Sequence, residues 1–189
     1  MDFEIAIVGG GPGGLAAALS AKEAGAKSIA LFERKEQWGA PVQCAGYAPR
    51  LLGRILPFDS AAVRCKVDSL QLFHESALLK DLRSPGYMLR REVLEKQAAE
   101  AAMREGVLCF QPCKVIAIQD DRLAVEDGSV VHEHHARIII GADGPRSIVR
   151  RAMQLPDHLL ATGLEYELPM LAAPTAAEIH FSPSYGAGY

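Results

Sequence analysis

The chain has 189 residues, of which 49% are hydrophobic and 23% are charged. This is the composition of a folded globular protein, and it excludes a disordered chain, a collagen-like chain and a disulfide scaffold. The 20 Lys and Arg residues are outnumbered by 23 Asp and Glu residues, so the basic surface typical of nucleic-acid-binding proteins is not expected. The sequence starts directly in a strand-like segment without a signal peptide and has no apolar run of membrane-spanning length, which favours a cytoplasmic protein with reduced cysteines.

A β-α-β unit is predicted for the first 33 residues. The apolar runs at 3–8 and 28–32 are typical of buried parallel strands, and the small residues and leucines between them predict a helix that ends at Gly25. A crossover of this kind joins parallel strands of one sheet, so we expect a parallel sheet.

Later segments alternate between helix and strand patterns. A long loop with one helical turn near 50–55 is expected over 35–57, and helices are expected from about 91 to 105 and over 147–153. Strands are expected as a pair within 64–82, at 107–110, as an antiparallel meander at 114–119, 122–125 and 130–134, as a buried strand at 137–141, and at 159–168 and 177–181.

Gly9, Gly11 and Gly14 form a Gly-x-Gly-x-x-Gly motif between the first strand and the first helix. Gly9 allows the tight turn, Gly11 lets a pyrophosphate approach the backbone, and Gly14 permits close helix packing. Glu33, at the end of the next strand, can accept hydrogen bonds from an adenosine ribose and would repel a 2′-phosphate. The motif therefore predicts a site for NAD or FAD rather than for NADP.

Neither the cysteines nor the histidines predict a metal site. Cys109 and Cys113 lack a second pair of ligands at zinc spacing, so buried thiols are the better interpretation. His132, His134 and His135 lack the helical spacing of a metalloprotease motif, and a solvated surface at the edge of the meander is expected for them.

Three segments in order resemble a flavoprotein group. They are Gly9–Gly14 with Glu33-Arg34, Arg91-x-x-Leu94-Glu95 heading a helix, and Gly141-Ala142-Asp143-Gly144 followed by Ser147-x-x-Arg150. The chain is similar here to proteins built as in p-hydroxybenzoate hydroxylase and geranylgeranyl reductase. The resemblance implies an α/β fold with a Rossmann-like FAD-binding domain of the glutathione reductase and p-hydroxybenzoate hydroxylase type, containing a parallel sheet and an antiparallel meander. It assigns residues 1–63 and 84–155 to that domain, and 64–83 and 156–189 to part of a β-rich substrate domain.

The resemblance also implies a set of cofactor-binding residues. Asp143 would contact the cofactor, and Arg91 would lie near the FAD phosphates and ribityl chain. With FAD as the cofactor, the expected binding residues are Gly9, Gly11, Pro12, Gly13, Gly14, Glu33, Arg34, Cys44, Ala45, Gly46, Arg91, Val115, Asp143 and Gly144.

Two features resemble the geranylgeranyl reductase branch of this group. Residues 41–46 (PVQCAG) are similar to that branch's cysteine loop beside the isoalloxazine ring, which makes Cys44 the candidate catalytic residue; a small apolar filler is its alternative. Residues 182–189 look like the lead-in to a Tyr-x-Trp-x-Phe-Pro signature, with Tyr189 as its first residue. Because the family's later Gly-Asp segment is also missing, we expect the chain to be truncated, with the length of about half an enzyme.

The resemblance implies a reductase that transfers hydride from reduced flavin to a carbon–carbon double bond of a polyprenyl substrate. NAD(P)H or ferredoxin would be the external electron donor, and an isoprenoid-lipid substrate would favour peripheral contact with a membrane. The alternatives are a flavin-dependent aromatic monooxygenase or halogenase of the same fold, and, from another class, a non-catalytic nucleotide-binding module. The sequence does not indicate the oligomeric state.

Overall fold

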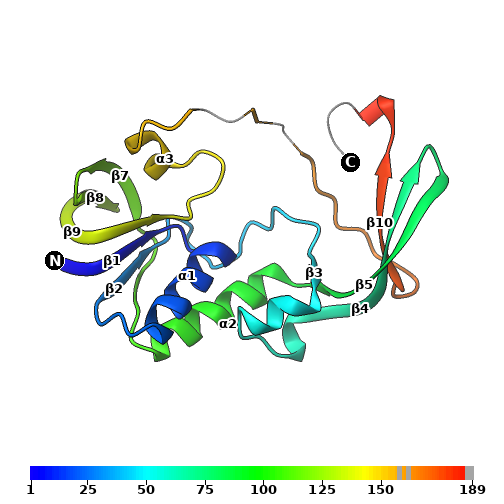
Figure 1. Ribbon diagram of the computed structural model, residues 1–189, viewed down its shortest axis with the longest axis horizontal. Helices are drawn as coiled ribbons and strands as arrows, with labels where there is room; N and C mark the ends of the chain where they lie inside the picture. The colour runs from blue at the N-terminus through cyan, green and yellow to red at the C-terminus, as the bar shows by residue number, and fades with distance from the viewer. Residues whose placement is uncertain (157–158, 161–162, 186–189) are drawn as a thin grey trace. The chain divides into compact units, whose positions relative to one another are not determined.

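β1 (Asp2–Val8) lies near the centre of a six-stranded sheet in the computed structural model, which describes residues 1–156, 159–160 and 163–185 (Figure 1). The strand order is β6-β2-β1-β9-β8-β7, where β2 spans Ile29–Phe32 and β6 spans Leu108–Phe110. β6, β2 and β1 are parallel, as predicted from their apolar runs. α1 (Pro12–Glu23) makes the crossover between β1 and β2 and packs against both strands.

The meander belongs to this same sheet. β7 (Lys114–Gln119) pairs with β8 (Arg122–Asp127), and β8 pairs with β9 (Val130–Gly141), both in antiparallel orientation. The sequence predicts separate strands at 130–134 and 137–141, and this prediction is wrong, because β9 is continuous. Its first half pairs with β8 and its second half pairs in parallel with β1, with His135 at the change of partner. The change from polar to apolar residues therefore reflects a change of neighbours rather than a turn.

The core of this sheet also corrects one expectation about the histidines. His134 is buried, and its ring packs against Phe3, Phe32 and Phe110 at centroid distances of 5.8, 5.3 and 5.7 Å. His132 is exposed and His135 is half-buried. The expected solvated surface is thus wrong for His134, because alternation along the middle of β9 directs His134 and Ala136 into the core.

Two further helices, α2 (Arg91–Arg104) and α3 (Ile148–Ala152), precede β6 and follow β9 in the chain. α2 buries Leu94, Ala98 and Ala102 at helical spacing, as the sequence predicts. α3 begins after Ser147, whose side chain accepts a 3.0 Å hydrogen bond from the N–H of Arg150.

A second sheet has the order β10-β4-β5-β3. β4 (Val63–His74) and β5 (Ala77–Leu89) form a long antiparallel hairpin, β10 (Ala176–Phe181) lies parallel to β4, and β3 (Tyr47–Pro49) pairs with the end of β5. Short 3₁₀ helices η1 (Arg50–Arg54), η2 (Ser60–Ala62) and η3 (Pro183–Tyr185) lie in the connections.

The chain divides into two compact units, Met1–Pro41 with Glu92–His158 and Val42–Arg91 with Leu159–Tyr189. Residues 42–63 and 84–91 thus group with the second sheet, whereas the sequence assigns them to the nucleotide-binding domain. The pairing of β3 with β5, which depends on contacts distant in sequence, accounts for the difference. Which unit serves cofactor and which serves substrate stays a prediction.

The C-terminal part of the structure differs from the sequence-based prediction at one strand. The strand expected at 159–168 is wrong for residues 159–160 and 163–168, which carry no strand and leave Leu159, Leu164 and Leu168 exposed. Tyr189, the expected first residue of the signature, lies outside the described residues. Within the described ranges, no helix has the length and apolar character needed to cross a membrane.

Candidate nucleotide-binding site

The glycine motif forms the turn from β1 into α1. Gly9 has a φ of 104°, and a Cβ atom placed on it would lie 2.3 Å from the carbonyl oxygen of Ala142. A Cβ on Gly14 would lie 1.9 Å from the carbonyl oxygen of Gly9. Both positions therefore require glycine, one for its backbone conformation and one for the close approach of the helix to the turn.

Gly11 and Gly13 have a different environment. A Cβ on either residue would meet no heavy atom within 4 Å. Gly11 is the N-cap of α1, Pro12 opens the helix, and no acidic side chain lies in the first turn. The N-terminal end of a helix carries partial positive charge and N–H groups that point outward. This end of α1 therefore has the space and the polarity to hold a phosphate group.

Glu33 ties the end of β2 to the glycine loop. Its side chain is only 8% exposed, and Oε2 accepts a 2.6 Å hydrogen bond from the N–H of Gly10. Oε1 accepts a 2.8 Å bond from the N–H of Lys35. Each carboxylate oxygen has a second lone pair, so the fixed carboxylate can still accept from a sugar hydroxyl.

Gly10, the middle residue of a run of three glycines, is not among the residues predicted from the sequence to form the site. A Cβ on Gly10 would lie 2.3 Å from Cζ3 of Trp38 and 2.9 Å from Cβ of Glu33. Only glycine fits between these two side chains. The run of glycines is the signal that could have identified it.

Asp143 lies beside the glycine loop. Its neighbour Ala142 donates an N–H bond of 2.8 Å to the carbonyl oxygen of Val8, which joins the end of β9 to the end of β1. Oδ2 of Asp143 accepts a 2.6 Å bond from the N–H of Ile148. Oδ1 is buried and has no hydrogen-bond partner among the described residues. A buried acceptor without a partner is costly, so a ligand hydroxyl or N–H would fit here.

The structure brings the two predicted motifs of the first unit together. A Cβ on Gly9 would lie 2.8 Å from Cα of Asp143, and Gly14 and Glu33 border the same loop. The open positions at Gly11 and Gly13 and the unpartnered Oδ1 of Asp143 fit a dinucleotide such as FAD. Gly144, with a φ of 78°, continues the turn after Asp143.

Of two other predicted binding residues of the first unit, one is exposed and one is buried. Arg34 is exposed directly after Glu33. Val115 is buried in β7 opposite Val125, where its side chain belongs to the core. A role of Val115 at a cofactor would therefore have to come from its backbone.

Cys44, Ala45, Gly46 and Arg91 belong to the second unit. Cys44 and Ala45 are exposed, and Arg91 opens α2. Gly46 has a φ of 88°, and its carbonyl oxygen accepts a 2.8 Å bond from the N–H of Leu89. A Cβ on Gly46 would lie 2.7 Å from the carbonyl oxygen of Leu89, which explains this glycine structurally. The flavin-related roles of these four residues stay predictions.

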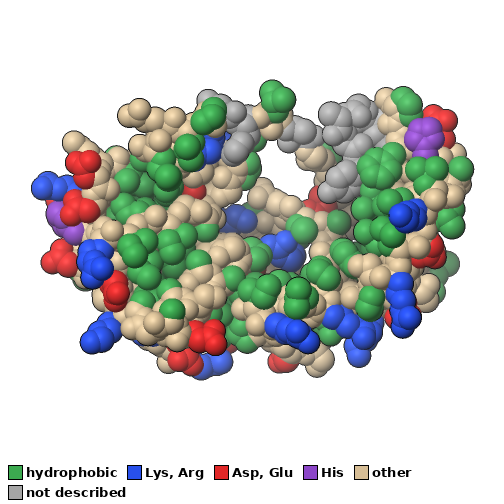
Figure 2. Space-filling view, in the orientation of Figure 1, with side chains coloured by type: hydrophobic (Ala, Val, Ile, Leu, Met, Phe, Trp, Pro, Cys, Tyr) green, Lys and Arg blue, Asp and Glu red, His purple; other side chains and the backbone are tan. Residues whose placement is uncertain are grey.

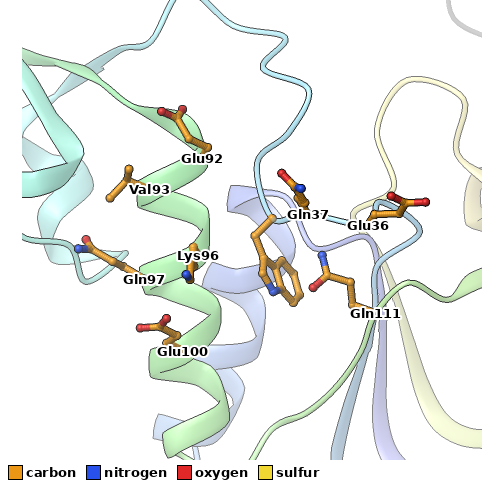
Figure 3. A pocket seen from close by; sticks show the side chains of 9 residues that line it. Glu36, Gln37, Glu92, Val93, Lys96, Gln97, Glu100 and Gln111 are labelled. Atoms are coloured by element: carbon orange, nitrogen blue, oxygen red, sulfur yellow. The ribbon is translucent and has the colours of Figure 1, made fainter.

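A pocket of about 630 Å³ lies between the loop after β2 and one face of α2 (Figure 3). Gln111 Nε2 and Glu92 Oε2 are buried there without a hydrogen-bond partner in the described part of the chain. The acidic side chains outnumber the single lysine, so the pocket suits a neutral or cationic group better than a phosphate. It is lined by Glu36, Gln37, Trp38, Glu92, Val93, Lys96, Gln97, Glu100 and Gln111.

The cysteines of the first unit are protected thiols. Burial raises the pKa of Cys109 to about 11, and burial together with the nearby Asp127 raises the pKa of Cys113. A thiol held in its protonated form is a poor nucleophile and a poor metal ligand. Over the residues that the structure describes, no cluster of three or more His, Cys, Asp or Glu side chains could hold a metal ion.

Comparison with known proteins shows what the chain is similar to. Residues 4–49 match the model of an FAD binding domain, which covers the glycine motif, Glu33 and the cysteine loop. The chain is 33% identical to digeranylgeranylglycerophospholipid reductase 1 of Methanopyrus kandleri, over 97% of this chain and 52% of that protein. It is also 30% identical to an uncharacterised protein of Methanosarcina barkeri, over 82% of this chain and 89% of that one.

Over nearly its whole length the chain is thus similar to the N-terminal half of a digeranylgeranylglycerophospholipid reductase, in the part that matches an FAD binding domain. A crystal structure of a geranylgeranyl bacteriochlorophyll reductase-like protein from Thermoplasma acidophilum superimposes with a TM-score of 0.76 at 20% identity. That match covers 95% of this chain and 50% of that structure, and it confirms the predicted fold class. The chain thus spans about half the length of the named reductase it matches.

Proposed function

We propose that this chain binds FAD and serves as the nucleotide-binding part of a reductase that acts on carbon–carbon double bonds of an isoprenoid chain. The observation that carries the proposal is the match over 97% of the chain to a digeranylgeranylglycerophospholipid reductase. The Glu33 and Asp143 geometry supports it independently, because both carboxylates border one glycine loop and retain acceptor capacity.

Three groups of the first unit would hold the cofactor. The N-terminal end of α1, from Gly11, would bind the pyrophosphate. The carboxylate of Glu33 would accept from the adenosine ribose, and Oδ1 of Asp143 would accept from a hydroxyl of the cofactor. When bound, FAD would supply the hydride that reduces the double bond.

The family resemblance assigns cofactor-related roles to two further residues, Cys44 and Arg91. Cys44, in the segment that resembles the family's cysteine loop, would lie beside the flavin ring. Arg91 would neutralise phosphate charge of the cofactor with its guanidinium group. The substrate would be an isoprenoid or another hydrophobic small molecule, and NAD(P)H or ferredoxin would deliver electrons.

The test is an anaerobic reaction of the purified, FAD-loaded chain with chemically reduced flavin and a geranylgeranyl lipid dispersed in detergent. The proposal predicts a product that has gained one molecule of hydrogen per reduced double bond, detected by mass spectrometry. In a parallel aerobic reaction with an aromatic substrate, oxygen consumption with incorporation of one oxygen atom into that substrate would instead assign the chain to the hydroxylases. Tight FAD binding without either reaction would leave a nucleotide-binding module and would overturn the proposed activity.

A further inference from the structure

A short segment of the second unit combines exposed apolar side chains with exposed arginines. Leu51 in η1 is 58% exposed, and Ile55, directly after η1, is 51% exposed. Each follows an arginine in the sequence, Arg50 and Arg54, and both arginines are exposed. We call this surface, Arg50, Leu51, Arg54 and Ile55, the η1 surface.

The η1 surface is part of a fixed turn. The N–H groups of Ile55 and Leu56 both donate to the carbonyl oxygen of Leu52, at 2.9 Å each. Leu56 is fully buried, and Phe58 packs edge-on against Tyr87 of β5, with ring centroids 5.8 Å apart. The residues that follow the turn therefore anchor it to the second sheet, while Leu51 and Ile55 remain outside the core.

The charge around the η1 surface is opposite in sign to that of the whole chain. Two arginines and no acidic residue lie between Val42 and Phe58. The stretch 42–91 contains eight Lys and Arg residues and four Asp and Glu residues, whereas the whole chain has a formal charge of −3. Figure 2 shows Lys and Arg side chains gathered beside hydrophobic ones over η1 and β4.

We propose that the η1 surface docks on the anionic face of a lipid bilayer. Leu51 and Ile55 would enter the boundary between headgroups and acyl chains, and the guanidinium groups of Arg50 and Arg54 would bind lipid phosphates. With two apolar side chains and two arginines, the contact is weak, reversible and sensitive to salt. The choice of a lipid partner rests on the proposed isoprenoid substrate, which would reside in such a bilayer.

The experiment is sedimentation of the full chain with vesicles of equal parts phosphatidylcholine and phosphatidylglycerol, and with vesicles of phosphatidylcholine alone. We expect binding to the anionic vesicles that falls roughly 10-fold between low and high salt, and much weaker binding to the neutral ones. The double variants Leu51→Asp with Ile55→Asp, and Arg50→Glu with Arg54→Glu, should each lower binding by about 10-fold or more.

A matched control comes from the other end of the β4–β5 hairpin. Leu78 and Leu79 are 52% and 64% exposed, as Leu51 and Ile55 are, but the charged residues near them in sequence, Glu75, Lys80 and Asp81, have a net negative charge. Leu78→Asp with Leu79→Asp should bind vesicles as the unmodified chain does. Far-ultraviolet circular dichroism of every variant checks that the fold is intact.

The proposal is overturned if the unmodified chain does not bind anionic vesicles, or if it binds neutral vesicles as well as anionic ones. It is also overturned if the Leu78/Leu79 variant loses as much binding as the Leu51/Ile55 variant. Reduction of a detergent-dispersed lipid is measured separately and should be unchanged in the η1 variants. Vesicle binding without any reductase activity would contradict the proposed function and leave the docking surface standing.

Discussion

The backbone N–H of Gly10 and the Oε2 atom of Glu33 lie 2.6 Å apart and form a buried hydrogen bond. This bond fixes the carboxylate at the end of β2 against the turn that follows β1. Since Oε1 is held by Lys35, the orientation of the whole carboxylate is set before any ligand arrives. A fixed acceptor loses little conformational entropy when it binds a sugar hydroxyl.

Substitution of Glu33 should therefore affect both stability and cofactor binding. Glu33→Ala removes the acceptor of a buried N–H and should lower the free energy of unfolding by about 1–3 kcal/mol. FAD affinity should fall by about 10-fold or more, because a hydrogen-bonding charged group is lost. Urea unfolding and a flavin fluorescence titration measure the two effects. An Ala variant with unchanged affinity would exclude Glu33 from the site.

Asp143 offers a way to separate structure from binding. One oxygen holds the N–H of Ile148, and the other is buried without a partner among the described residues. Asp143→Ala should lower both stability and FAD affinity. Asp143→Asn can keep the bond to Ile148, so its free energy of unfolding should stay within about 0.5 kcal/mol while FAD affinity falls about 10-fold. Equal effects of Asn and Ala on stability would contradict this division of roles.

Gly10→Ala tests the packing that holds the loop. The new Cβ would lie 2.3 Å from Cζ3 of Trp38, so the indole or the loop must move, which costs about 1–3 kcal/mol. FAD retention should fall with it. The control is Gly163→Ala, because that glycine has open space around it. Adding Trp38→Ala to Gly10→Ala should recover part of the loss; no recovery would show that the clash with Glu33 dominates.

His134 predicts a pH dependence of stability. Burial lowers its pKa below the usual 6.5, with the N-terminus and His132 as smaller causes. The unfolded chain therefore binds more protons at His134 near this pH. The contribution of neutral His134 to the free energy of unfolding is present above pH 6.5 and is lost as the pH falls below that value. His134→Phe should remove this part of the loss. Urea unfolding on both sides of pH 6.5 measures it, and a variant with the same acid sensitivity as the unmodified chain would contradict the assignment.

Local features of the sequence predicted the β-α-β unit, the glycine turn and α2. Gly9 and Gly14 are fixed by contacts within a few residues or by the backbone itself, and apolar spacing defines α2. The continuity of β9, the pairing of β3 with β5 and the burial of His134 depend on partners distant in sequence. Alternation and propensity alone do not identify such partners.

We propose that Glu33 and Asp143 hold FAD at the glycine loop. Titration of the purified chain with FAD, followed by the change in flavin fluorescence, measures this binding. We predict saturation at one FAD per chain, and loss of that binding when Glu33→Ala and Asp143→Ala are combined. Absence of saturable binding, or equal binding by the double variant, would contradict the claim.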